Sequence, residues 1–152
     1  MTYEVDQSGK VEQTNLDTIL VLTNAESFSV VLKKKDKRTV QSWFKSKKIV
    51  RRFQYEIFSL LLAILLDISK PKHIVNVDTE YQGFENVILE RVNYYLKSLD
   101  FKNYPIKFGH VGKTSRSHLF ASKIVSKKQK PTKIVTLKEL KKIGTQFGRW
   151  AI

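Results

Sequence analysis

The sequence has no cysteine, only three prolines and one methionine, and half as many acidic residues as basic ones. Without cysteine the chain can form neither disulfides nor thiolate metal sites. Its longest apolar run, Ile57–Leu66, contains only Ser59 as a polar residue, but this run is too short to cross a bilayer, which requires about 20 apolar residues. The N-terminal segment has no apolar core typical of a signal peptide. We therefore expect a cytoplasmic protein with no membrane partner.

The shortage of acidic residues gives the 152-residue chain a net charge of +14, from 28 basic and 14 acidic side chains. The basic residues gather in three segments, 33–38, 45–52 and 123–133. Such clusters are typical of proteins that bind the phosphates of nucleic acid, with an affinity that falls as salt rises. A lysine-rich composition without a partner and attraction to acidic lipid are the alternatives that charge alone leaves open.

Hydrophobic periodicity predicts strands that alternate with helices. Three antiparallel strands are expected first, at residues 2–8, 18–23 and 28–32, and we expect the lysine run after Leu32 to be solvated. A long helix follows from about Thr39 to Ile68, with a division into two helices at 45–48 as the alternative. The later elements are a strand at 73–77, a helix at 84–99, a strand at 106–111, a helix at 117–125, a short strand at 133–135 and a helix that begins with a capping box at Thr136.

This order of elements predicts one α/β domain, which is the default at this length. We expect a mixed five-stranded sheet, with three antiparallel strands followed by β-α units, flanked by helices. Residues 1–125 would form its core, and residues 126–152 would be a basic extension of the same domain. We expect the protein to be a monomer.

Two acids stand at the ends of apolar elements. Glu56 begins the apolar run of the long helix, and Asp78 ends a β-branched strand. Carboxylates brought to one end of a sheet by a buried helix and a central strand indicate a metal site. For each acid taken alone, the alternative is that Glu56 caps a turn and Asp78 starts a loop. We interpret Glu80, two residues after Asp78, as a solvated acid at the strand end. The alternatives are a spare metal ligand or a side chain that supports a ligand.

Four short motifs resemble those of ribonuclease H domains. They are Asp6-Gln7-Ser8-Gly9 on the first strand, Glu56–Ala63 on the long helix, Ile74–Tyr81 around the fourth strand, and Val111–Ala121 at the closing turn and helix. The resemblance covers roughly residues 1–125 and implies a ribonuclease H-like sheet with a two-metal catalytic site. Asp6 and Asp78 would bind or bridge both ions. Glu56 would hold one ion and orient water, and His118 would close the shell of the other.

The residue types suit the chemistry that this resemblance implies. Two divalent ions can activate a water and stabilise a leaving 3′-oxygen, and Mg²⁺ prefers carboxylate oxygens. The family usually has aspartate where this chain has His118, although the Argonaute nucleases, on the same fold, can use histidine there. A histidine ligand suits Mn²⁺ better than Mg²⁺. We therefore expect Mn²⁺ to support more activity than Mg²⁺.

The chain also departs from the family in its basic segments. The stretch between Asp78 and His118 is short, so the basic substrate handle of some relatives is expected to be absent, and the basic region between Asp6 and Glu56 could replace it. A helix that starts near Ser115 could also bind phosphate at its N-terminus. The residues expected to contact nucleic acid are Lys45, Lys47, Lys48, Arg51, Arg52, Lys113, Ser115 and Arg116.

The resemblance implies a metal-dependent endonuclease that cleaves the RNA strand of an RNA–DNA hybrid. Two alternatives remain open. One is a non-catalytic nucleic-acid-binding protein on the same fold, such as a ribosome-associated protein, and the other is a junction resolvase or transposase-like DNA nuclease. Aromatic residues could stack on bases, but we expect Trp43, Phe44 and Trp150 to lie in the core or a lid.

Overall fold

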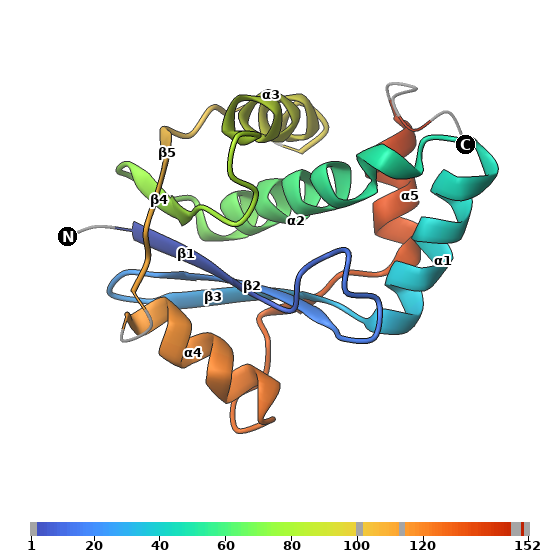
Figure 1. Ribbon diagram of the computed structural model, residues 1–152. Coiled ribbons are helices and arrows are strands. Elements are labelled where there is room, and N and C mark those ends of the chain that lie inside the picture. The colour runs from blue at the N-terminus through green and yellow to red at the C-terminus, as the bar shows by residue number, and fades with distance from the viewer. Residues whose placement is uncertain (1–2, 100–101, 113–114, 147–149, 151–152) are drawn as a thin grey trace.

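A six-stranded mixed sheet with the order β5-β4-β1-β2-β3-β6 forms the centre of the protein (Figure 1). The computed structural model describes residues 3–99, 102–112, 115–146 and 150. The strands are β1 (Tyr3–Ser8), β2 (Thr18–Thr23), β3 (Ser27–Leu32), β4 (Val75–Asp78), β5 (Ile106–Gly109) and β6 (Lys133–Ile134). The helices are α1 (Lys34–Ser46), the 3-10 turn η1 (Val50–Arg52), α2 (Phe53–Ser69), α3 (Glu85–Leu96), α4 (Arg116–Val125) and α5 (Leu137–Thr145).

The α/β class and the opening antiparallel strands agree with the sequence prediction, but the prediction of five sheet strands is wrong. β1, β2 and β3 pair antiparallel, and β4 and β5 extend the sheet parallel to β1. The sixth strand, β6, adds parallel to the outer edge of β3. Ser29 and Thr132 anchor this pairing, since the backbone N–H of each donates to the hydroxyl of the other at 2.9 Å.

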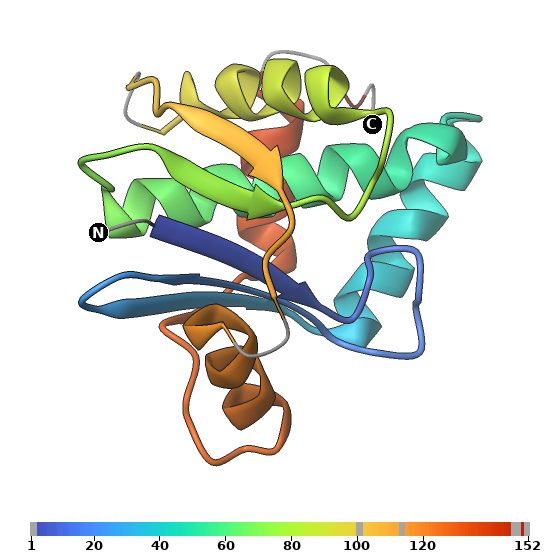
Figure 2. The same cartoon turned by 60° about the vertical axis from the view of Figure 1, so that its left-hand side comes forward.

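Helices cover both faces of the sheet (Figures 1 and 2). α2 packs over β2 and β3 on one face, with α3 alongside it, and α4 packs over β1 and β2 on the other face. Residues 56–66 of α2 are all buried, because the sheet, α3 and α5 all contact this helix. This placement explains why the apolar run has no polar stripe.

Trp150 connects the C-terminal part of the chain to the core. Its side chain is fully buried, its ring meets the Phe44 ring edge-on at a centroid distance of 5.1 Å, and its Nε1–H donates to Tyr95 Oη at 2.7 Å. Gly144 leaves room for the indole, because a Cβ at that position would overlap the Trp150 ring. Of the two locations predicted for Phe44 and Trp150, the core or a lid, the structure shows the core.

The expectation that the lysine run after Leu32 is solvated is wrong for Lys37. The helix predicted at 39–68 divides into two after Ser46, which confirms the alternative of a division at 45–48, and α1 begins five residues earlier than predicted, within the lysine run. Lys37 is fully buried, and its ammonium donates to Lys10 O at 3.1 Å, Gln13 O at 2.7 Å and Thr18 Oγ1 at 3.0 Å. These bonds fasten the loop between β1 and β2 to α1.

Burial lowers the pKa of Lys37 to about 8, while the negative charges of Asp17 and Glu12 act in the opposite direction. The ammonium form, with three hydrogens to donate, therefore predominates at pH 7.

Among the helices that the structure describes, none is long and apolar enough to span a membrane.

We expect Lys37→Met to lower the free energy of unfolding by about 2–3 kcal/mol, because two carbonyls and a hydroxyl lose their buried donor. Urea unfolding followed by circular dichroism at pH 7 measures this loss. Lys35→Met is the matched control on the exposed side of the same helix and should change stability little. Equal effects of the two substitutions would contradict the anchoring role of Lys37.

Candidate metal centre

The parallel pairing of β1 with β4 places two aspartates next to each other. The register sets Val5 opposite Val77, and both valines are buried in the main core cluster with α2. The next residue on each strand, Asp6 or Asp78, therefore points to the other face of the sheet. Asp6 is buried and Asp78 is half-buried. Asp6 and Asp78 thus lie together at one end of the sheet, as the resemblance to ribonuclease H domains implies.

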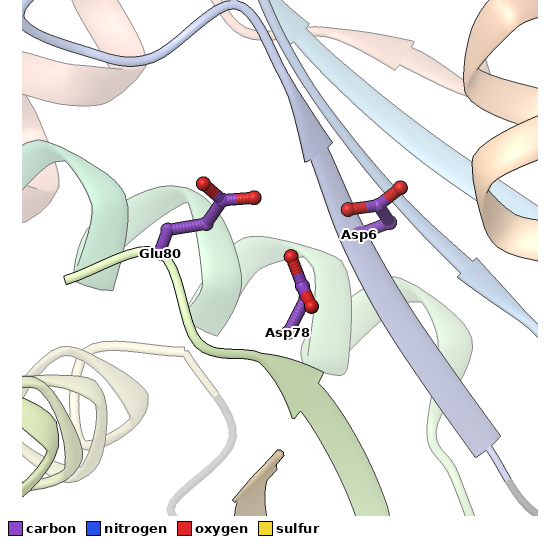
Figure 3. A group of neighbouring side chains, drawn as sticks. All are labelled: Asp6, Asp78 and Glu80. Carbon is purple, nitrogen blue, oxygen red and sulfur yellow. The ribbon is translucent and has the colours of Figure 1, made fainter. Parts of the chain in front are cut away.

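Glu80 completes a group of three carboxylates (Figure 3). It lies in the bend after β4, and one oxygen from each of Asp6, Asp78 and Glu80 is within 4.8 Å of the others. Figure 3 shows the three side chains converging from the end of β1, the end of β4 and the segment that follows β4. Clustered carboxylate oxygens are the ligands that Mg²⁺ and Mn²⁺ prefer, so the donor set fits a divalent ion.

Hydrogen bonds hold the two aspartates in place. Asp6 Oδ1 accepts from the backbone N–H of Gln7 at 2.9 Å, and Asp6 Oδ2 lies 3.1 Å from Nδ1 of His118 on α4. Asp78 Oδ1 accepts from the backbone N–H of Val111 at 2.8 Å. Two segments that follow β5 in sequence therefore restrain the carboxylates of the two central strands.

His118 is positioned by the cap of its own helix. Ser115 is the N-cap of α4, and its Oγ accepts from the backbone N–H of His118 at 3.1 Å. The imidazole is 42% exposed, whereas the carboxylate it contacts is 7% exposed. His118 thus joins the site through Asp6.

The crowding of the acids changes their protonation. Burial, followed by a hydrogen bond and charge repulsion from Asp78, raises the pKa of Glu80 to about 7. Burial is also the main cause that raises the pKa of Asp6, while its bonds from Gln7 and His118 act in the opposite direction. Because the folded pKa of Glu80 exceeds the ordinary value of 4.5, the folded state loses stability as the pH rises from about 4.5 to about 7. A bound cation would offset this loss.

Glu56 does not join this group. It is fully buried on α2, where its Oε2 lies 2.9 Å from Arg52 Nη2 and its Oε1 lies 3.1 Å from Arg91 Nε. Tyr95 Oη also donates to Glu56 Oε1 at 2.8 Å, and Tyr95 in turn accepts the bond from Trp150. The structure thus places Glu56 in an ion-pair network among α2, α3 and Trp150, whereas the sequence interpretation placed it beside Asp6 and Asp78.

Glu80 supplies the third carboxylate in its place. The interpretation of Glu80 as a solvated strand-end acid is therefore wrong, and its alternative as a metal ligand matches the observed grouping. The signal was present in the sequence as the two-residue spacing from Asp78, which keeps both side chains on one face of an extended segment.

The predicted nucleic-acid contacts fall on two separate surfaces. Lys45, Lys47, Lys48 and Arg51 are exposed around the end of α1 and η1, on the α2 side of the sheet (Figure 1). Arg116 is exposed at the start of α4, which covers the opposite face.

Three of the predicted contacts differ from the rest. Arg52 forms an ion pair with buried Glu56, and the Ser115 hydroxyl caps α4. Lys113 lies outside the described residues. The basic residues with no such internal role are therefore the exposed lysines and Arg51 at the end of α1, and Arg116 on α4.

No protein family, curated protein or solved structure matches this chain in the three comparisons.

The carboxylate group predicts a metal-dependent gain in thermal stability that depends on pH. With EDTA, Glu80→Gln should melt higher than the wild type at pH 8 but not at pH 5, because only ionised Glu80 repels the aspartates. Mn²⁺ at about 100 times its Kd should raise the wild-type Tm at pH 8 by roughly 5–10 °C, with a smaller rise at pH 5. Circular dichroism melts measure both effects, with the exposed-turn variant Glu26→Gln as control. If Mn²⁺ raised the Tm of Glu80→Gln as much as that of the wild type, Glu80 would not be a metal ligand.

The Glu56 network predicts a separate effect. Glu56→Gln should lower the free energy of unfolding by about 3 kcal/mol, because two guanidinium groups lose a buried partner. The same variant should keep the wild-type Tm rise with Mn²⁺, since Glu56 lies outside the carboxylate group. Loss of the Mn²⁺ effect in a variant that circular dichroism shows to be folded would place Glu56 back among the metal ligands.

Proposed function

We propose that this protein is a ribonuclease H-like, metal-dependent endonuclease that cleaves the RNA strand of an RNA–DNA hybrid. The observation that carries the proposal is the convergence of Asp6, Asp78 and Glu80 at one end of the sheet, with His118 against Asp6. These residues lie in motifs that resemble those of ribonuclease H domains. Asp6 lies in the first-strand motif, Asp78 and Glu80 lie in the fourth-strand motif, and His118 lies in the closing motif.

Electrostatics supports a cation at this point of the surface. The chain carries +14 overall, yet three acids lie within 4.8 Å of one another at the end of β1 and β4. A phosphodiester would be repelled by these carboxylates, since like charges at such distances repel strongly in a partly desolvated site. Divalent cations would convert the group from a barrier into a binding place for phosphate.

The residues of the chain have separable roles in this proposal. Asp6, Asp78 and Glu80 would hold two Mg²⁺ or Mn²⁺ ions. When bound, such ions supply Lewis-acid activation of water and stabilise the charge of the leaving oxygen. His118 restrains the Asp6 carboxylate through Nδ1, and the Val111 N–H restrains the Asp78 carboxylate. Both contacts keep ligand oxygens oriented without a rearrangement of the backbone.

The proposed reaction is hydrolysis of one phosphodiester bond. The oxygen of a water molecule forms a bond to phosphorus as the bond from phosphorus to the 3′-oxygen breaks. One proton leaves the water, and the 3′-oxygen gains a proton to become a hydroxyl. The products are a 5′-phosphate and a 3′-hydroxyl, and no oxidant or other co-reactant is needed.

A non-catalytic nucleic-acid-binding protein is the second candidate, and the position of Glu56 favours it. The resemblance gives that glutamate a metal-binding role, but here it is held by Arg52, Arg91 and Tyr95. If Glu80 does not replace it, the site lacks one of its ligands. The basic surfaces would then bind phosphates without cutting them.

The deciding experiment is cleavage of an end-labelled RNA–DNA hybrid in Mn²⁺, Mg²⁺ or EDTA. Duplex DNA, single-stranded RNA and a four-way junction serve as competing substrates. We expect cutting of the hybrid in Mn²⁺, slower cutting in Mg²⁺ and none in EDTA. Asp78→Asn should reduce the rate at least about 100-fold, the scale seen when a charge-stabilising group is removed.

Asp67→Asn is the matched control, because Asp67 lies on α2 with Lys70 as its partner and is outside the carboxylate group. Equal cutting by Asp78→Asn and the wild type would overturn the proposal. Tight, salt-sensitive binding without cutting by either protein would favour the binding protein, and preference for the junction would favour a resolvase.

A further inference from the structure

A groove of about 540 Å³ lies on the α4 side of the sheet. Its apolar walls come from Ile19 and Val31 on the sheet, Ile124 and Val125 at the end of α4, and Leu16 in the loop before β2. Leu16 is 47% exposed and Val125 is 56% exposed, so both present apolar surface to the groove. The volume is in the range of small-molecule sites, about 300–1,000 Å³.

Lysines surround this apolar groove. Lys33, Lys34, Lys127 and Lys130 line it, and Asp17 is the single acid among the described residues that line it. Asp17 is already engaged, because its Oδ2 lies 3.5 Å from Lys33 Nζ and its Oδ1 accepts from the Lys34 backbone N–H. Among the described residues, Lys34, Lys127 and Lys130 have no acidic partner. The rim therefore suits an anionic ligand that also has an apolar part.

The groove adjoins the carboxylate group on the same face of the sheet. Asp6 pairs with Val21 across the strands, and the next row on that face is Ser8, Ile19 and Val31. Ser8, Ile19 and Val31 all line the groove, and two residues of a strand advance by about 6.7 Å. α4 runs along the same direction, from His118 beside Asp6 to Ile124 in the groove. The two sites are thus neighbours on one surface.

We propose that this groove is a nucleotide subsite, which binds an unpaired nucleotide of the same strand whose phosphodiester is held at the carboxylate group. The base would lie against the apolar walls, and the adjoining phosphates would lie against the lysine rim. The inference rests on the proposed function for the identity of the strand. It adds a requirement to the substrate, namely an unpaired nucleotide next to the scissile bond, as at the boundary between a hybrid and single-stranded RNA.

The combination of charge and position selects a nucleotide over other anionic ligands. A base has an apolar face and is linked to phosphates on both sides, which matches an apolar groove bordered by cations. A base within a duplex could reach the groove only after leaving its stack, which costs a few kcal/mol. An overhang or mismatch avoids that cost, so the groove discriminates by base pairing and not by base sequence.

Lys127 offers a variant that separates binding from folding. Its φ is +62°, in the left-handed region at the end of α4, where glycine is the favoured residue. Lys127→Gly would therefore remove a rim charge without adding backbone strain. Lys70→Gly is the matched control, because Lys70 has φ +47° at the end of α2 and does not line the groove.

Binding is measured by fluorescence anisotropy in EDTA, so no strand is cut and the result does not depend on cleavage. The probes are a blunt RNA–DNA hybrid and the same hybrid with a short single-stranded RNA overhang. The wild type should prefer the overhang by roughly fivefold or more, the scale of one well-bound base. Val125→Glu should abolish this preference, whereas Ile74→Glu, at a similarly exposed apolar site ahead of β4, should keep it.

Lys127→Gly should keep the wild-type Tm and lower the slope of log affinity against log salt by about 0.7 for the overhang probe. Lys70→Gly should leave that slope unchanged. No preference for the overhang in the wild type, or the same preference in Val125→Glu, would overturn the proposal even if the hybrid is cleaved. Val125-dependent binding of an acidic peptide or of phosphatidylserine vesicles, in place of the overhang, would also overturn it.

Discussion

The parallel register of β1 and β4 is the constraint on which the rest of the site depends. With Val5 opposite Val77, both valines face the core under α2 and both following aspartates face α4. A shift of one residue in either strand would reverse these faces, putting a carboxylate into the core and a valine into the site. Burial of the two valines in the core thus fixes the positions of the two aspartates on the other face of the sheet.

The position of Asp78 could be predicted from the sequence because the end of its strand is marked by local signals, whereas Asp6 and His118 were indicated by the resemblance to ribonuclease H domains. The direction of Glu56 could not be predicted. Each residue of a helix turns by about 100° from the last, and the apolar run of α2 is buried on every side, so its pattern does not indicate which side faces the strand ends. Arg52, one turn earlier, pairs with Glu56, and so do Arg91 and Tyr95 on α3. The contacts with α3 leave no local signal in the sequence.

The environment of individual lysines also could not be predicted from the sequence. A run of like charges predicts a solvated segment, yet Lys37 is buried because two carbonyls of the β1–β2 loop and the Thr18 hydroxyl at the start of β2 accept its hydrogens. Lys127 and Lys130 were part of a predicted basic cluster, but the groove that they border depends on Leu16 and Ile19, which are far from them in sequence. Composition predicts that the surface is positively charged, but only the tertiary structure shows which groups the lysines border.

The two tryptophans lie in different environments, so the intrinsic fluorescence of the protein can report on local structure. Trp150 is buried, with its N–H bonded to Tyr95 and its ring against Phe44. Trp43 is half-buried, with the Lys141 ammonium 5.5 Å from its ring centroid. Indole emission shifts to longer wavelength in polar surroundings, so Trp150 should emit at the shorter wavelength. Separation of Trp150 from Phe44 on α1 and Tyr95 on α3 would then appear as a red shift in intrinsic fluorescence.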